Sequence, residues 1–439
     1  MYRLQYIIVS FLLLFSFISL SSHAQNDMRE DSLGLTAVIQ QVISNYPSIK
    51  KAEQDIEAAN ARIGLAKAAY YPLINIDASY TRLGPVTSLT IPTLGTFTMD
   101  AADNYDMGLN YNQVIYDFGK ISGKVDLEKQ NRMLSQLSME QLKQQLSLSL
   151  LNQYYSILYL QDAIKIKDEE LKTLGEHLTF VQKQEATGTS TQYAILSTQV
   201  RISTTENQKT DLQTSLQILQ AQMNSFLGNP QERHLVVKDE LLPPVILDAN
   251  EKLISAAYLQ REELKIARQR SEIASTRYHI AGITNYPEFD LFASGGFKNG
   301  YIPELNVLKA NYIAGVSFKF PIFDGNKVKY NQQQIRAEMK SVDQDTELAS
   351  RNIANEIIEN KANVDAALKK IRQQELQLKQ AQQAYELAQT SFQAGTITNL
   401  DLLDSETALA ESRLALMKSK IDYTVSLFKL KIATGEHIY

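Results

Sequence analysis

The sequence predicts a mixed α and β membrane protein that is built from an internal two-fold repeat. Three observations lead to this prediction. A long stretch of the chain recurs at a fixed offset, two long segments lack proline, and four segments alternate between apolar and polar residues. The repeat sets the symmetry, the segments without proline set the length of the helices, and the alternation sets the position of the strands.

The repeat is seen in matching residues that lie 207 positions apart. The pairs are Asp117 and Asp324, Gly188 and Gly395, and Gly228 and Gly435. In both halves 71 residues separate the aspartate from the first glycine, and 40 more lead to the second. Flexible segments tolerate insertions, so a spacing that is kept over this length indicates a rigid element.

All ten prolines lie outside residues 93–229 and 322–439, which are rich in Leu, Gln, Ala, Lys and Glu. Because proline costs roughly 3 kcal/mol inside a helix, these segments favour long uninterrupted helices. We expect long helices at 120–187 and 327–394, each about 100 Å at about 1.5 Å per residue. A glycine turn ends each of them, and helices return at 190–227 and 398–435.

In four segments of about 10 residues, apolar and polar residues alternate, as expected of strands that cross a bilayer. They form two β-hairpins, 72–117 and 287–322, whose loops are 83–103 and 299–310. The residues expected to face lipid are Ile74, Ile76, Tyr105, Met107, Leu109, Phe289, Leu291, Val316 and Phe318. Small membrane barrels need at least about 8 strands. Three copies of the chain supply twelve, so the sequence predicts an oligomer.

The remaining segments complete the domain organisation. Residues 1–24 have the basic start, apolar run and small residues of a secretory signal peptide, although an uncleaved anchor is the alternative. The repeats then cover 25–228 and 251–439, with helices 35–69 and 251–284 ahead of the hairpins. Residues 229–250 form a linker between the repeats, with a short strand expected at 235–237.

Enzyme chemistry is not indicated. The chain has no cysteine, its five histidines are scattered, and no phosphate-binding loop or nucleophile elbow occurs. We therefore expect no enzyme activity, no cofactor and no resident metal site. The acidic balance, 44 basic against 49 acidic residues, gives no reason to expect a nucleic-acid partner.

Several motifs, in order and at matching spacing, resemble the TolC-like outer membrane efflux proteins. They are "LTAVIQQVISNYPSIKKA" near the start, "REELKIA" at 261–267, "FPIFDGNK" at 320–327 and "FQAGTITNLDLLDSETAL" at 392–409. The resemblance implies a homotrimer with a 12-stranded barrel in outer-membrane lipid and an antiparallel α-helical barrel in the periplasm. It also implies docking to a periplasmic adaptor, which connects the trimer to an inner-membrane RND, ABC or similar pump. The protein is then the passive exit duct of an efflux or secretion system.

Similarity to the family's helix tips suggests two kinds of site. Asp401 and Asp404 match carboxylates at the pore entrance, and the alternative is that Asp401 is part of a helix cap and Asp404 a solvated surface charge. The tip turns Gly188, Thr189, Gly395 and Thr396 are candidate adaptor contacts. Ala194 occupies the first-half position that matches Asp401, and Phe392 and Ile397 stand where family members can carry charged or phenolic groups that link neighbouring helices. We therefore expect closure of the tips to depend more on Leu400, Leu403 and packing.

A second class of function is consistent with the same helices and strands. A secreted coiled-coil scaffold or adhesin would use the strands as a soluble sheet that is buried on one side. The alternating strands and the matched tips favour the channel.

Overall fold

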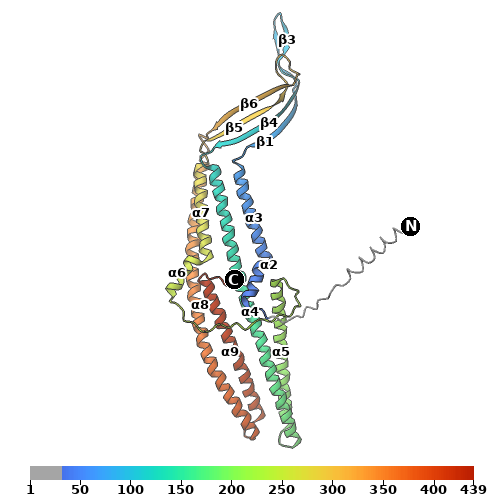
Figure 1. The fold of residues 1–439 in the computed structure, drawn as a ribbon, viewed down its shortest axis with the longest axis vertical. Coiled ribbons are helices and arrows are strands. Elements are labelled where there is room, and N and C mark those ends of the chain that lie inside the picture. Colours follow the sequence, from blue (N-terminus) through green and yellow to red (C-terminus); the bar gives the residue numbers. More distant parts are fainter. Residues whose placement is uncertain (1–31) are drawn as a thin grey trace, which may run out of the picture.

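A computed structural model describes residues 32–439, and the predicted signal peptide lies outside these residues. The molecule is long and thin, with a β-sheet at one end and helices that run away from it to two tips (Figure 1). The C-terminus lies at the middle of the molecule, a region called the waist below (Figure 1).

Two helices of equal length run from the sheet to the tips. They are α4 (Lys120–Ala186) and α8 (Lys327–Gln393), with 67 residues each. Shorter helices lie against each of them in pairs, one near the sheet and one near the tip (Figure 1). The shorter helices are α3 (Pro47–Ala68) and α5 (Gln192–Leu227) beside α4, and α7 (Glu262–Ile283) and α9 (Asn399–Ala433) beside α8.

The two halves meet along α4, which contacts α7 near the sheet and α9 nearer the tips. In the half of the molecule that contains the tips, α5 and α8 are therefore the outer helices of a four-helix layer.

An aspartate that recurs in both halves fixes where each long helix begins. The Asp117 carboxylate accepts hydrogen bonds from the N–H groups of Gly119 and Ile121, at 3.0 and 2.5 Å. Asp324 accepts from Asn326 and Val328 in the same way, at 2.9 and 3.0 Å.

The helices expected at 35–69 and 251–284 are each interrupted, which corrects the prediction. The first consists of α2 (Leu35–Asn45) and α3, and Tyr46 between them is extended because Pro47 disfavours a helical residue before it. The second consists of α6 (Asn250–Gln260) and α7, although no proline is present. Here Arg261 is extended, with φ −63° and ψ 130°.

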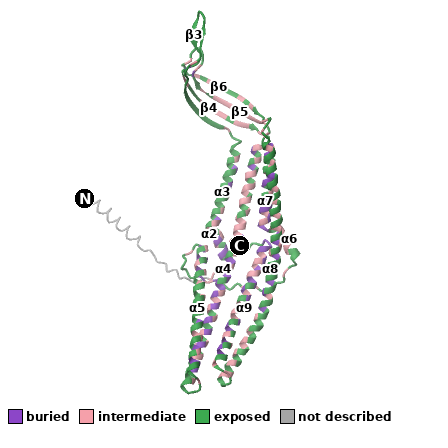
Figure 2. Cartoon of the chain, turned by 180° about the vertical axis from the view of Figure 1, so that it is seen from behind, coloured by how far each residue is buried: buried purple, intermediate pink, exposed green. Residues whose placement is uncertain are grey.

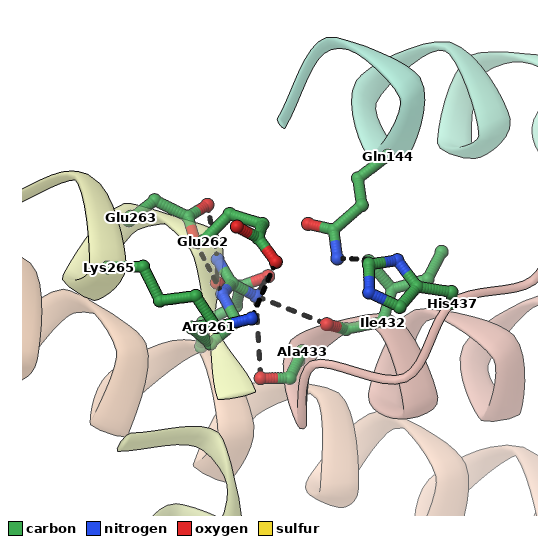
Figure 3. A network of polar contacts seen from close by, with 9 residues as sticks. Gln144, Arg261, Glu262, Glu263, Lys265, Ile432, Ala433 and His437 are labelled. Carbon is green, nitrogen blue, oxygen red and sulfur yellow. Dashed lines mark hydrogen bonds and ion pairs between the residues drawn. The ribbon is translucent and has the colours of Figure 1, made fainter. Parts of the chain in front are cut away.

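Arg261, whose side chain is buried, is held in this break by a network of polar contacts (Figure 3). Its guanidinium group donates to both oxygens of Glu263 at 2.9 Å and to Glu356 of α8 at 2.9 Å. It also donates to the carbonyl groups of Ile432 and Ala433, at 3.5 and 3.4 Å, where α9 ends. Burial alone lowers the pKa of Arg261, but the two carboxylates outweigh it and raise the pKa. The side chain thus stays charged and joins α6, α7, α8 and α9.

The linker between the repeats wraps around the waist, where buried tyrosines hold it. Tyr154 donates to the carbonyl groups of Leu33 and Lys238, and Tyr155 to that of Glu240. The strand expected at 235–237 is wrong in extent, because only one parallel bridge forms, between Leu33 and Val237. Within this segment the side-chain amides of Gln161 and Gln220 donate to the carbonyl group of Leu235, at 3.2 and 2.7 Å, in place of a partner strand.

The sheet has four antiparallel strands in the order β1-β4-β5-β6. They are β1 (Leu73–Arg82), β4 (Asp103–Tyr116), β5 (Glu288–Lys298) and β6 (Lys309–Lys319). The segment expected as a plain loop at 83–103 contains a second small hairpin, β2 (Ser88–Ile91) with β3 (Gly95–Thr98). Its own short alternation of Leu, Ile and Phe with Thr explains this difference.

One face of the four-stranded sheet is mainly apolar and the other is mainly polar. The register places Ile76 opposite Leu109 and Leu291 opposite Val316, and all nine residues predicted to face lipid share this face. On the other face Asp77 accepts hydrogen bonds from Asn75 and Asn110, at 2.6 and 2.5 Å. None of the four strands contains a buried residue, whereas the helices bury the sides that face one another (Figure 2).

Removing the Arg261 side chain tests its role at the waist. We expect Arg261→Ala to destabilise the protein by about 1–3 kcal/mol, because buried acceptors lose their donor. Arg261→Lys restores only part of this loss, since an ammonium group cannot donate two parallel hydrogen bonds to one carboxylate as a guanidinium group does. The measurement is thermal unfolding followed by circular dichroism. Arg270→Ala, at an exposed arginine of α7, is the matched control. Equal unfolding temperatures for the two alanine variants would contradict this role.

Candidate functional site at the helix tips

The two tips lie at the end of the molecule away from the sheet (Figure 1). Both tip turns have the same geometry. Gly188 and Gly395 are left-handed, with φ of 76° and 73°, which glycine adopts without strain. The N–H groups of Thr189 and Thr396 reach back to Gln184 and Ser391 at 2.8 and 3.0 Å, and their hydroxyl groups donate to the same carbonyl oxygens.

These bonds explain why the glycine and threonine recur in both halves, because they end each long helix. The space around both glycines is open, since an added Cβ would meet no atom within 4 Å. The turns that the sequence suggests as adaptor contacts are therefore accessible in the chain. Their role in docking stays a prediction.

Asp401 takes part in a capping box at the start of α9. Its carboxylate accepts from the N–H and hydroxyl groups of Thr398 at 2.9 and 2.6 Å, and the threonine hydroxyl accepts from the Asp401 N–H at 3.2 Å. The bonds from the Thr398 side chain and backbone lower the pKa of Asp401. In the first half Thr191 caps α5 without such a carboxylate, because Ala194 stands at the matching position.

Asp404 forms an ion pair with Arg201 of α5, at 2.9 Å. Next to it Asn399 donates to the carbonyl group of Ala194 and to the hydroxyl groups of Ser197 and Thr198, at 3.3, 3.1 and 3.2 Å. Nε2 of His177, on α4, lies 2.6 Å from the Asn399 side-chain oxygen. We refer to the contacts of Arg201, Asp404, Asn399 and His177 as the tip link.

The tip link adds polar contacts within one chain to the apolar packing on which closure of the tips is expected to depend, and that expectation stays a prediction. Phe392 does pack, with its ring centroid 5.2 Å from that of His177 and 6.1 Å from that of Phe180. However, polar contacts that the sequence did not suggest join the halves. No local pattern could have revealed them, since the partners are 201 to 222 positions apart in the chain.

A buried carboxylate lies farther from the tip, on α9. Glu406 is only 6% exposed, and its Oε1 atom has no hydrogen-bond partner. Burial raises its pKa to about 8, Glu170 of α4 adds to this effect, and Arg201 opposes it. Glu170 itself pairs with buried Lys167 at 2.7 Å and accepts from Thr205 at 3.3 Å. In the sequence Glu406 looks like an ordinary solvated helix residue.

Residues 32–439 bring no three His, Cys, Asp or Glu side chains together in a way that could hold a metal ion. Among the helices described for this part of the chain, none combines the length and the apolar character of a membrane span.

The buried carboxylate predicts a pH dependence of stability. The pKa of Glu406 in the folded chain lies above its ordinary value of 4.5, so the folded state binds the proton more tightly. Stability therefore falls as pH rises from about 4.5 through about 8, by about 1.4 kcal/mol per pKa unit at most. We expect Glu406→Gln to unfold at a higher temperature than the parent near pH 9, and the difference to vanish near pH 4.5. Glu411→Gln, at an exposed position of the same helix, is the control. If the unfolding temperature at high pH rises as much in Glu411→Gln as in Glu406→Gln, the prediction is wrong.

Comparison with known proteins identifies the family. Residues 38–229 and 253–436 match the profile described as "Outer membrane efflux protein". The chain is 26% identical to the alkaline protease secretion protein AprF of Pseudomonas aeruginosa over 425 residues, which cover 93% of this chain and 86% of AprF. It is 22% identical to the outer membrane protein TolC of Vibrio cholerae, covering 91% of this chain and 90% of TolC.

The fold agrees with these matches. The crystal structure of the outer membrane protein VceC from Vibrio cholerae superimposes with a TM-score of 0.74 at 20% identity, covering 92% of this chain and 97% of VceC. The two matched segments of the profile correspond to the two repeats, and together they account for most of the sequence. The chain therefore belongs to the outer membrane efflux protein family and is a channel of the outer membrane that extends into the periplasm, not an enzyme.

Proposed function

We propose that three copies of the chain form a channel-tunnel that serves as the passive exit duct of an efflux or secretion system. A periplasmic adaptor docks at the helix tips and connects the duct to an inner-membrane RND, ABC or similar pump. One observation carries this proposal. In a single chain the sheet has an unpaired strand at each edge, and the helical layer near the tips has an uncovered helix at each edge.

The sheet edges are β1 and β6, and neither has a partner strand within the described part of the chain. Unpaired strand edges in a membrane leave backbone groups without hydrogen bonds, which is costly in lipid. Pairing β6 of one copy with β1 of the next closes a barrel, and three copies give the twelve strands that a small membrane barrel can have.

The helix edges near the tips are α5 and α8, and both expose apolar side chains. On α5 they are Tyr193, Leu196 and Val200, at a spacing of three and four residues that places them on one face. On α8 Leu376 and Leu387 are exposed. Contact between α5 of one copy and α8 of the next covers both sets and continues the helical layer into a closed tube.

The apolar sheet face supports a place in lipid over the alternative of a soluble scaffold. Ile76 is 73% exposed and Val316 is 62% exposed, and no helix covers either of them. A soluble sheet would bury this face. In the proposed barrel it contacts the hydrocarbon interior, and the Asn75, Asp77 and Asn110 cluster faces the lumen.

The tips supply the docking surface and the entrance. The Gly188–Thr189 and Gly395–Thr396 turns project freely, so an adaptor can contact their backbone without displacing other parts of the chain. Asp401 and Asp404 are both exposed close to the second turn. Three copies place six carboxylates around the entrance, and such a ring favours the passage of cations.

Substitution on opposite faces of β1 tests the proposed barrel. We expect Ile76→Arg to cost roughly 2–4 kcal/mol and to reduce assembly, because it places a charge in the lipid interior. Ser79→Arg, which points into the proposed lumen, is the matched variant and assembles normally. The measurement is the mass of the detergent-solubilised assembly on native gels, together with conductance in planar bilayers. If both variants assemble equally well, the sheet is soluble.

Two conservative changes separate the roles of the entrance aspartates. Asp404→Asn breaks the ion pair with Arg201, so we expect a higher single-channel conductance in planar bilayers and a lower preference for cations. Asp401→Asn keeps an oxygen for the cap, so we expect a lower cation preference without a higher conductance. If neither change alters ion selectivity, the two aspartates are a helix cap and a surface ion pair only, and the entrance lies elsewhere.

A further inference from the structure

We propose that a cavity between α4, α8 and α9, close to the tips, binds a small organic cation, namely a protonated primary amine held by Glu406. The cavity has a volume of about 190 Å³. A second cavity of about 90 Å³ adjoins it, and Thr173, Tyr385 and Glu406 line both. This space is large enough for an amine with a short alkyl chain.

The lining of the larger cavity has the chemistry of a cation site. It contains the carboxylates of Glu176 and Glu406 and no lysine or arginine. Phe180, Tyr385 and Phe392 supply aromatic rings to the same cavity. Carboxylates form strong hydrogen bonds to ammonium groups, and aromatic faces attract cations, so both kinds of group favour the same ligand.

Glu406 is the group that lacks a partner. It is more than nine-tenths buried, and its Oε1 atom accepts no hydrogen bond within the chain. A buried acceptor without a donor is costly, and a bound ammonium group removes this cost.

The neighbouring cations of the chain are already paired. Lys167 is bound to Glu170 at 2.7 Å, Arg201 to Asp404 at 2.9 Å, and Arg413 to Glu169 at 3.0 Å. Each would have to leave a carboxylate in order to reach Glu406. A cation from outside the chain is therefore the partner that the site is built to take.

The position of the cavity suggests what binding does. α4 belongs to the first half of the chain, whereas α8 and α9 belong to the second. A cation between them joins the halves at the same level as the tip link and stabilises the arrangement in which the tips are together. This consequence depends on the proposed duct, but the binding itself does not.

Calorimetric titration of the detergent-solubilised full-length assembly with n-butylammonium chloride tests the site. We expect saturable binding to the parent, and no binding of n-butanol, which has the same chain without the charge. Glu406→Gln weakens binding by at least about tenfold, a loss of about 1.4 kcal/mol or more. Glu176→Gln weakens it severalfold, and Glu411→Gln, at an exposed position of α9, leaves it unchanged.

A second readout identifies the carboxylate directly. Near pH 7 Glu406 is mostly protonated, so binding of the amine releases up to about one proton per site, which appears as a dependence of the measured enthalpy on the buffer. This release is absent in Glu406→Gln.

Three results would overturn the proposal: no saturable binding to the parent, equal binding of n-butanol, or unchanged binding with unchanged proton release in Glu406→Gln. Conductance in planar bilayers is measured on the same samples. A conducting assembly without amine binding refutes this site only, whereas binding without conductance refutes the proposed duct only.

Discussion

The structure depends on one constraint, which is that two helices of the same length begin and end at the same levels. Asp117 and Asp324 accept hydrogen bonds from the first turns of α4 and α8, and this fixes the start of each helix. Gly188 and Gly395 end them 71 residues later. Because α4 lies against both α7 and α9 of the other half, an insertion in one helix would shift one tip past the other. This explains why the spacing is kept so closely between the repeats.

The waist holds these long helices together. The largest fully buried side chains include Tyr154, Tyr155 and Tyr423, whose hydroxyl groups bond to the backbone of the linker. The tip, in contrast, has a small apolar cluster around Val181, Ala194 and Ile195. Stability in a protein follows the density of such buried contacts, so it decreases from the waist toward the tips. The end that admits cargo in the proposed duct is thus also the end that separates most easily.

Sequence patterns predicted the parts of this fold that depend on local periodicity. Alternation with a period of two gave the four strands, and the absence of proline gave the two long helices. The break at Tyr46 follows from Pro47 and could have been read from the sequence. The break at Arg261 could not, because its cause is a network with Glu356 and the end of α9, 95 and 171 positions away. The same reason hid the pair of Arg201 and Asp404. Glu406 is as buried as Glu170, but Glu170 pairs with Lys167 and no such pair forms at Glu406, a difference that the sequence does not show.

The tip contains two kinds of polar contact, and they respond differently to separation of the halves. The capping box of Thr398 and Asp401 lies within α9, so it moves with that helix and survives any opening. The tip link joins α9 to α4 and α5 and must break when the halves part. Glu406 lies on the same boundary, where an unpaired carboxylate weakens the closed arrangement and a partner for it strengthens that arrangement. In the proposed duct, opening therefore exchanges a few polar bonds and the packing of Phe392 between the hairpins for water, and it leaves the folded structure of each hairpin intact.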